Sequence, residues 1–170
     1  MVQIVVPEEF PYVLLAGCIL TIECFVIGGS IFGPRTRCFN KDFMAQFKDE
    51  HKKYFPDGEP SVGGWPDAGE GRYSDKLAYK DWVEFNNHMR THQNFVESLP
   101  VILIFLIVGG MVLPQAAAII GFVNAVTRPV YTFMYAKYGS NSRVLGAVAG
   151  SLPLYLLGMA TFGRLVMSVL

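Results

Sequence analysis

Charged residues are scarce in this chain of 170 residues: only 16% are Asp, Glu, Lys or Arg, whereas 52% are hydrophobic. A soluble domain is about one-quarter charged, so this chain has too little polar surface to cover a fold in water. A basic excess is also absent, because fourteen Lys and Arg residues balance fourteen Asp and Glu residues. This balance argues against a nucleic-acid partner. With a mean hydropathy of +0.34, the composition indicates a small integral membrane protein.

Cysteine is equally sparse, and its spacing is uninformative. Cys18, Cys24 and Cys38 form no CxxC pair, so neither a disulfide framework nor a zinc site is expected. The N-terminal segment is acidic and its first apolar run is too long for the core of a signal peptide. We therefore expect no cleavable leader.

The charges are concentrated in one part of the chain, which predicts where the membrane lies. Residues 35–90 contain ten of the fourteen basic and ten of the fourteen acidic residues. Charged groups are costly within a bilayer, and about 20 apolar residues cross it as a helix. The apolar runs predict four spans, at 12–32, about 82–111, about 116–137 and about 143–167.

These spans predict an all-α fold, an up-down-up-down membrane four-helix bundle formed by a single domain of residues 1–170. A polar connection at about 38–80 is rich in Gly, Pro, Asp and Lys, and we expect a surface loop without regular structure through its middle. Every Lys and Arg except Arg164 belongs to one face of this bundle, which the positive-inside rule places in the cytosol.

Two polar stripes enter the predicted bundle at this face. Arg90, Asn94 and Glu97 share one face of the second span, and Arg128, Tyr131 and Tyr135 share one face of the third. Either the two stripes satisfy each other or they bind a charged group. Buried cations without partners are costly, and Arg37, Arg90, Arg128 and Arg143 outnumber the single carboxylate of Glu97. The surplus favours a ligand with more than one carboxylate or phosphate, although arginines that reach lipid phosphates are the simpler alternative.

A histidine pair on the second span suggests a different chemistry. His88 and His92 are spaced i, i+4, which is compatible with gripping a metal ion. The chain has no HExxH motif, and its cysteines lie elsewhere. We expect hydrogen bonding at the start of the helix and no metal.

Two segments resemble a known family. FNNHMRTHQNFVESLPVILIFLIVGG resembles the signature of the MAPEG family, the membrane-associated proteins of eicosanoid and glutathione metabolism, with its RxHxN..E pattern at Arg90, His92, Asn94 and Glu97. RPVYTFMYAKYGSNSRVLGA is similar to a second block of that family, in which an arginine and two tyrosines precede a later arginine. The resemblance covers residues 8–37 and 83–168, and is strongest to the type 3 microsomal glutathione transferases.

The resemblance implies a homotrimer that binds glutathione between adjacent subunits. It assigns the backbone and termini of the tripeptide to Arg90, Asn94 and Glu97, with His92 in the same motif. Hydrogen bonds would come from Tyr131 and Tyr135. Contacts with the carboxylates would come from Arg37 and Arg128, and Arg143 would bind the sulfur.

The implied activity is that of a glutathione transferase, with glutathione peroxidase activity, acting on lipophilic electrophiles or lipid hydroperoxides in the membrane lipid. An endoplasmic reticulum membrane is expected first, and a mitochondrial or other organellar membrane second. Ser98 and Leu99 stand where many relatives have a tyrosine after the glutamate, and Pro129 interrupts the second block. These departures and the long loop motivate an alternative, in which the chain is a non-catalytic accessory subunit of a larger membrane complex.

Overall fold

The computed structural model describes residues 6–170, apart from the side chains of residues 143, 145 and 147. Within this part of the chain the regular elements are all helical. In chain order they are α1 (Phe10–Ser30), α2 (Phe32–Cys38), α3 (Lys41–Ala45), α4 (Lys48–Tyr54), η1 (Ser74–Lys76), α5 (Tyr79–Val112), α6 (Pro114–Tyr138), η2 (Ser140–Ser142) and α7 (Arg143–Val169).

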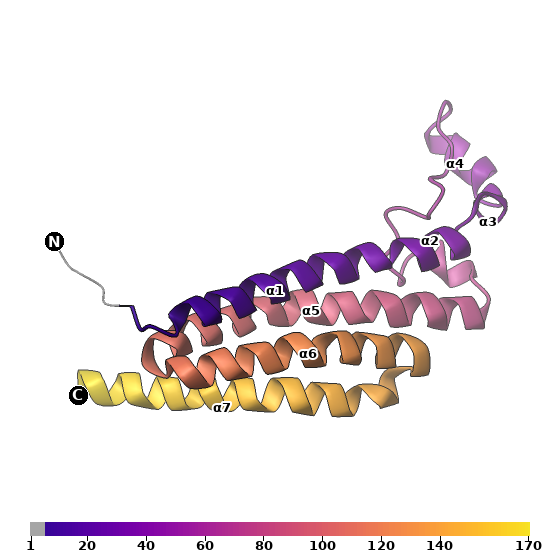
Figure 1. Cartoon of the computed structure of the whole chain (residues 1–170). Helices are drawn as coiled ribbons and strands as arrows, with labels where there is room; N and C mark the ends of the chain where they lie inside the picture. The colour runs from indigo at the N-terminus through magenta and orange to yellow at the C-terminus, as the bar shows by residue number, and fades with distance from the viewer. Residues whose placement is uncertain (1–5) are drawn as a thin grey trace.

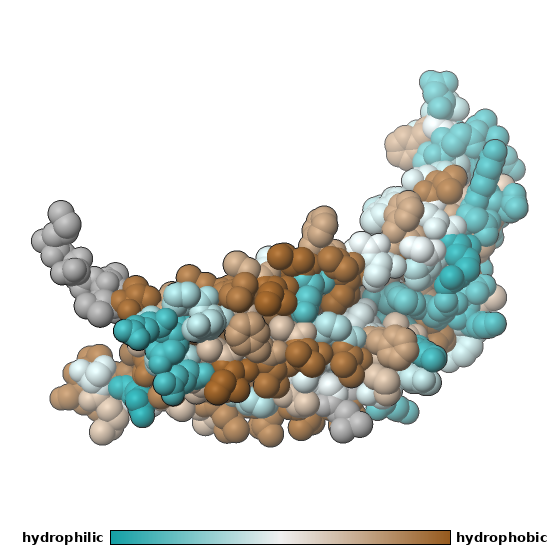
Figure 2. Space-filling view, viewed as in Figure 1, coloured by the Kyte–Doolittle hydropathy of each residue, from teal (hydrophilic) through white to brown (hydrophobic). Residues whose placement is uncertain are grey.

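The predicted all-α membrane bundle is confirmed. Four helical segments are long and apolar enough to cross a bilayer, namely Phe10–Cys38, Tyr79–Val112, Pro114–Tyr138 and Val148–Val169. α1, α5, α6 and α7 run side by side along one axis, with the start of α1 and the end of α7 at the same end (Figure 1). Apolar residues cover much of the outside of this bundle, as expected of a surface that contacts lipid (Figure 2). The protein is therefore an integral membrane protein.

Small residues allow the helix α6 to pack closely on two of its neighbours, α1 and α7. A Cβ atom at Gly121 would lie 2.7 Å from the Cβ of Ala16 on α1. On the other side, a Cβ atom at Gly146 of α7 would lie 2.8 Å from the Cβ of Tyr131. Both separations are too short for real side chains, so glycine is required at these crossings. Small residues at helix contacts are typical of membrane bundles.

The end of the first span differs from the sequence prediction, which placed it at Phe32 before Gly33 and Pro34. The helix is interrupted only at Ile31, and α2 then continues to Cys38. Pro34 lies in the first turn of α2, where a missing backbone N–H costs little. The last turns of α2 consequently lie beside α5 instead of beginning the loop.

The connection between α2 and α5 is a folded unit, which we call the excursion (residues 39–78). The excursion folds around a side chain of the preceding helix, that of Arg35 on α2, which is only 2% exposed. The guanidinium of Arg35 donates hydrogen bonds to the backbone carbonyls of Gly63 (3.0 Å) and Asp67 (2.7 Å). The ring of Trp65 covers it at 3.9 Å, and the ring of Phe85 from α5 lies at 5.0 Å. Arg35 therefore ties the excursion to the bundle.

Asp67 organises the following turn of the excursion. Its carboxylate accepts hydrogen bonds from the backbone N–H groups of Gly69 (2.7 Å), Gly71 (3.2 Å), Tyr73 (2.9 Å) and Ser74 (2.7 Å). Burial alone would raise the pKa of Asp67, but the hydrogen bonds from Ser74 and Gly69 outweigh it and hold the pKa below its usual value. Residues 55–73 contain no helix, in agreement with the predicted loop, yet their backbone is fixed by these contacts.

Candidate functional site

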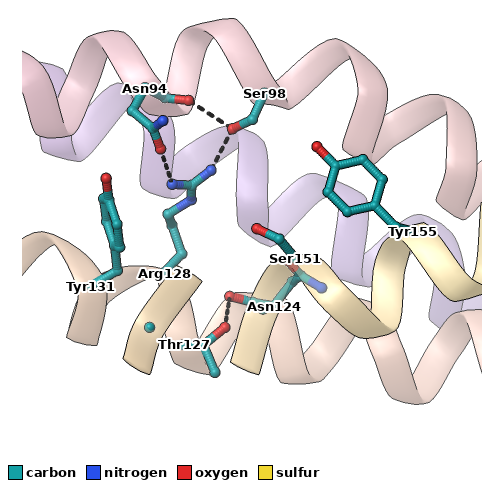
Figure 3. A pocket seen from close by; sticks show the side chains of 10 residues that line it. Asn94, Ser98, Asn124, Thr127, Arg128, Tyr131, Ser151 and Tyr155 are labelled. Atoms are coloured by element: carbon teal, nitrogen blue, oxygen red, sulfur yellow. Dashed lines mark hydrogen bonds between the residues drawn. The ribbon is translucent and has the colours of Figure 1, made fainter. Parts of the chain in front are cut away.

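Arg128 is the basic side chain at the centre of the candidate site. It lies on α6 and points toward α5, where two side chains hold its guanidinium (Figure 3). Nη1 donates to Oδ1 of Asn94 at 2.9 Å, and Nη2 donates to Oγ of Ser98. The ring of Phe95 lies 4.3 Å from the guanidinium carbon. Because Asn94 and Ser98 are four residues apart on one helix face, they fix both ends of the guanidinium.

The hydrogen-bond partners of Arg128 are neutral, and the carboxylate of Glu23 on α1 interacts with it electrostatically without forming an ion pair. Among residues 6–170 no carboxylate lies within the 4.0 Å that defines an ion pair with this side chain. Arg128 is also part of a membrane-spanning segment, Pro114–Tyr138. A cation at this depth is expensive unless a counter-charge or a polar cavity accompanies it.

Such a cavity opens beside Arg128, between α5, α6 and α7. Its volume is about 280 Å³, and it is lined by Asn94, Ser98, Asn124, Thr127, Arg128, Tyr131, Gly146, Gly150, Ser151 and Tyr155. A second cavity of about 200 Å³ shares six of these residues and adds Glu97, Val101, Ile102 and Leu154. The two cavities therefore adjoin, and the second adds three apolar side chains and one carboxylate to the lining.

Two glycines on α7 leave room for the cavity. Gly146 and Gly150 are one turn apart, and both line it. A Cβ atom at Gly150 would lie 2.8 Å from Oγ1 of Thr127 and 3.3 Å from Oδ1 of Asn124. Larger residues at these two positions would displace α7 or fill the space. The polar lining of α6 is thus accessible because α7 presents no side chain at positions 146 and 150.

Four of the predicted site residues meet at this cavity. Asn94, Arg128 and Tyr131 line its polar part, and Glu97 lines the adjoining part. Tyr135 is buried one turn further along α6, with its ring 5.9 Å from that of Tyr131, and is not part of the lining.

The other predicted residues lie elsewhere in the chain. Arg37 is at the end of α2 and forms a surface ion pair with Glu84. Arg90 is exposed on α5 and donates to Oε1 of Gln93 at 3.3 Å. His92 lies against α1, because a Cβ atom at Gly28 would approach its Nε2 to 2.8 Å. The side chain of Arg143 lies outside the described residues, although its backbone begins α7.

Four polar residues of the cavity were not predicted from the sequence, namely Asn124, Thr127, Ser151 and Tyr155. A signal for them existed, because Asn124 and Thr127 stand four residues before Arg128 and Tyr131 on the same helix. Ser151 and Tyr155 have the same spacing on α7. The phenol of Tyr155 points toward Ser98 (Figure 3). Polar residues within an otherwise apolar span indicate a shared cavity when they recur at helical spacing.

The helices that carry this cavity match a known family. The model of the MAPEG family matches residues 44–163, which include all of α5 and α6 and most of α7. The match covers more than half of the 170 residues, and it contains both the polar stripe of α5 and that of α6. Proteins of this family are membrane proteins of eicosanoid and glutathione metabolism. This chain, with its four membrane helices and its arginine-centred cavity, belongs to the MAPEG family.

Proposed function

We propose that the protein is a membrane-bound glutathione transferase, with glutathione peroxidase activity toward lipid hydroperoxides. The observation that carries the proposal is the intramembrane guanidinium of Arg128, which faces a polar cavity and has only neutral hydrogen-bond partners. An anionic ligand would place a negative charge in direct contact with Arg128, and a carboxylate suits a guanidinium in both charge and geometry. Family membership makes glutathione the first candidate for this ligand.

The chemistry of glutathione matches the two parts of the cavity. The tripeptide has two carboxylates, one ammonium group and a thiol. One carboxylate pairs with Arg128, and the ammonium group pairs with Glu97 in the adjoining part of the space. The hydroxyl of Tyr131 lies at the polar end, where it can hydrogen-bond to the tripeptide.

Activation of the thiol is assigned to Arg143. A free thiol has a pKa of about 8.5, so most of it is protonated at neutral pH. A guanidinium beside the sulfur favours the thiolate, and each unit by which the pKa falls corresponds to about 1.4 kcal/mol. Arg143 begins α7 one turn before Gly146, which lines the cavity. The thiolate then adds to a lipophilic electrophile, or displaces its leaving group, as that molecule arrives from the bilayer. With a hydroperoxide it attacks the outer oxygen, the O–O bond breaks and the alcohol leaves, and a second glutathione reduces the resulting sulfenic acid to the disulfide with release of water.

The remaining predicted residues are proposed to act in a neighbouring subunit. Arg37 and His92 lie away from this cavity, on α2 and on the side of α5 that faces α1. In a homotrimer, these two residues and Arg90 would complete a glutathione site on the adjacent chain. We propose in addition that the protein lies in the endoplasmic reticulum membrane and is related most closely to the type 3 microsomal glutathione transferases.

One observation favours a second candidate function, that of a non-catalytic subunit of a larger membrane complex. Ser98 occupies the place of a tyrosine found in many relatives, and here its hydroxyl accepts a hydrogen bond from Arg128. The folded excursion also offers a surface for another protein. In this alternative the protein keeps the MAPEG fold and its cavity, but the cavity binds no glutathione.

Titration of the purified protein with glutathione separates the two functions. We expect the wild-type protein in detergent to bind glutathione and to develop the ultraviolet absorbance of a thiolate. Arg128→Met removes charge-assisted hydrogen bonds and should weaken binding by about ten- to hundred-fold, since each such bond contributes about 1.5–3 kcal/mol. Arg143→Ala should abolish the thiolate signal and the turnover while binding largely persists.

Arg164→Ala is the matched control, because Arg164 is an exposed arginine near the C-terminus of α7. We expect it to bind glutathione and to turn over as the wild type does. Absence of glutathione binding in the wild-type protein would support the accessory subunit. Binding that persists unchanged in Arg128→Met would place the site elsewhere.

A further inference from the structure

The excursion projects sideways from the bundle. It leaves the bundle where α2 ends and returns where α5 begins, and α3 and α4 extend away from the common axis of the long helices (Figure 1). The molecule is therefore L-shaped, with the bundle as its long arm. Because the long arm crosses the bilayer, both attachments of the excursion are close to one membrane surface. The inner side of the short arm faces in the direction of that surface.

The excursion holds this direction because its contacts with the bundle are specific. Arg35 binds the carbonyls of Gly63 and Asp67, and the amide of Asn86 on α5 donates to the carbonyl of Gly69 at 3.0 Å. An aromatic cluster joins its first half to the same helix, with Phe39 packed edge-on against Phe85 at 5.0 Å. The excursion is anchored at several points and not only at its ends.

Large apolar side chains are exposed on the excursion. They are Tyr54, Phe55, Val62 and Trp65, whose exposed fractions range from 55% to 75%. In the space-filling view, brown and tan atoms of the excursion lie toward the inside of the angle with α1, and its outer edge is teal (Figure 2). Exposed apolar residues grouped on one side mark an interaction surface.

The composition of this surface indicates what it contacts. Tyrosine and tryptophan are enriched where membrane meets water, because their rings are apolar and their edges form hydrogen bonds. Lys53 precedes Tyr54 directly on α4, and a lysine beside an apolar surface can reach lipid phosphates. The neighbouring Lys52 lies 3.6 Å from a carboxylate oxygen of Glu59. The lipid-facing side of the first span is also exposed near the excursion, because Phe25 and Phe32 are 83% and 64% exposed.

We propose that the inner side of the excursion rests in the phospholipid headgroup region of the membrane that the bundle crosses. The exposed aromatic side chains enter the boundary between headgroups and acyl chains, and Lys53 of α4 contacts phosphate. The outside of the bundle then contacts the acyl chains, and the inner side of the excursion contacts the headgroups at the adjoining membrane surface. This inference depends on the four membrane spans and is independent of the binding of glutathione.

The two tryptophans of the chain provide the test, because Trp65 is in the excursion and Trp82 is near the start of α5. Trp82→Phe leaves Trp65 as the single reporter. The protein is reconstituted into phosphatidylcholine vesicles that contain bromine either near the top or near the methyl end of the acyl chains. We expect Trp65 emission to be blue-shifted and to lose intensity with shallow bromine, with little loss for deep bromine or for aqueous acrylamide.

A second reporter covers the case in which Trp65 is too well shielded by its contact with Arg35. Phe55→Trp, combined with Trp65→Phe and Trp82→Phe, places a tryptophan at a position that is 61% exposed. Phe25→Trp in the same background is the positive control, because it reports a lipid-facing position within the first span. We expect quenching by shallow bromine at position 55 and by deeper bromine at position 25.

Each other result would overturn the proposal. Strong quenching of both excursion reporters by acrylamide, with none by bromine, would mean that the surface faces water. Protection from both quenchers that is lost when the protein is dissociated into single chains would mean that a second copy covers it. Protection of both excursion reporters from lipid and water in single chains would place their side chains inside the excursion.

Discussion

Replacement of the buried Arg35 by methionine should loosen the excursion while the membrane bundle stays folded. Methionine has a similar length but neither the charge nor the donors. The change leaves the carbonyls of Gly63 and Asp67 without their hydrogen-bond partner and removes the cation beneath Trp65. Arg37, two residues later, provides the contrast because its ion pair with Glu84 lies at the surface.

The expected magnitude follows from these contacts. Two hydrogen bonds from a charged donor contribute about 1.5–3 kcal/mol each. The desolvated contact with the aromatic ring contributes about 2 kcal/mol more. Part of this is offset because methionine has no guanidinium to desolvate, which recovers several kcal/mol. We expect a net loss of about 3–4 kcal/mol in the stability of the excursion, or about 100- to 1,000-fold in its opening equilibrium.

Amide hydrogen exchange of the protein in lipid nanodiscs measures this loss. Peptides that cover residues 61–77 should exchange about 100- to 1,000-fold faster in Arg35→Met than in the wild type, whereas peptides from α6 should be unaffected. Arg37→Met should change the same peptides by no more than about 1 kcal/mol, as expected for an exposed ion pair. Equal exchange in the two variants would refute the structural role given to Arg35.

Two further perturbations test other parts of the structure. Because the folded pKa of Asp67 is lowered, its contribution to stability is present above the unfolded value of about 3.9 and is lost as the pH falls through the folded value. Exchange in residues 67–74 should therefore accelerate below about pH 4, and an unchanged rate there would contradict the hydrogen-bonded carboxylate. Gly121→Val should destabilise the bundle by about 1–3 kcal/mol through overpacking on Ala16, measured by thermal unfolding in detergent. Gly29→Val is its control, since a Cβ atom there meets nothing within 4 Å, and equal effects of the two changes would argue against the close crossing.

The membrane bundle could be predicted from sequence because the signal that specifies it is local. Four apolar runs of sufficient length define the spans whatever surrounds them, and the structure reproduces all four. The stripe that contains Asn94 and the stripe that contains Arg128 are also local patterns, and these two residues are in hydrogen-bonding contact. Helical spacing was sufficient to predict that part of each stripe lies at one cavity, but Arg90 and Tyr135 are outside its lining.

The excursion could not be predicted in the same way, because its structure depends on contacts between distant residues. Arg37 was predicted to bind a ligand because it is similar to a family arginine, and Arg35 received no role. Arg35 is buried only because residues 63 and 67 fold back over it. No periodic pattern marks such a contact, and neither does the composition of a loop rich in glycine and proline.

The two glycine crossings of α6 determine how deep the charge of Arg128 sits in the bilayer. Gly121 meets Ala16 on one neighbouring helix, and Tyr131 meets Gly146 on the other, so Arg128 lies between two backbone contacts on its own helix. A long side chain on an isolated helix can adjust to bilayer thickness by stretching toward the nearer surface. Here the helix cannot slide past its neighbours, and Asn94 and Ser98 hold the tip of the side chain. A thinner or thicker bilayer would therefore tilt the whole bundle and leave this cation at a constant height relative to the other helices.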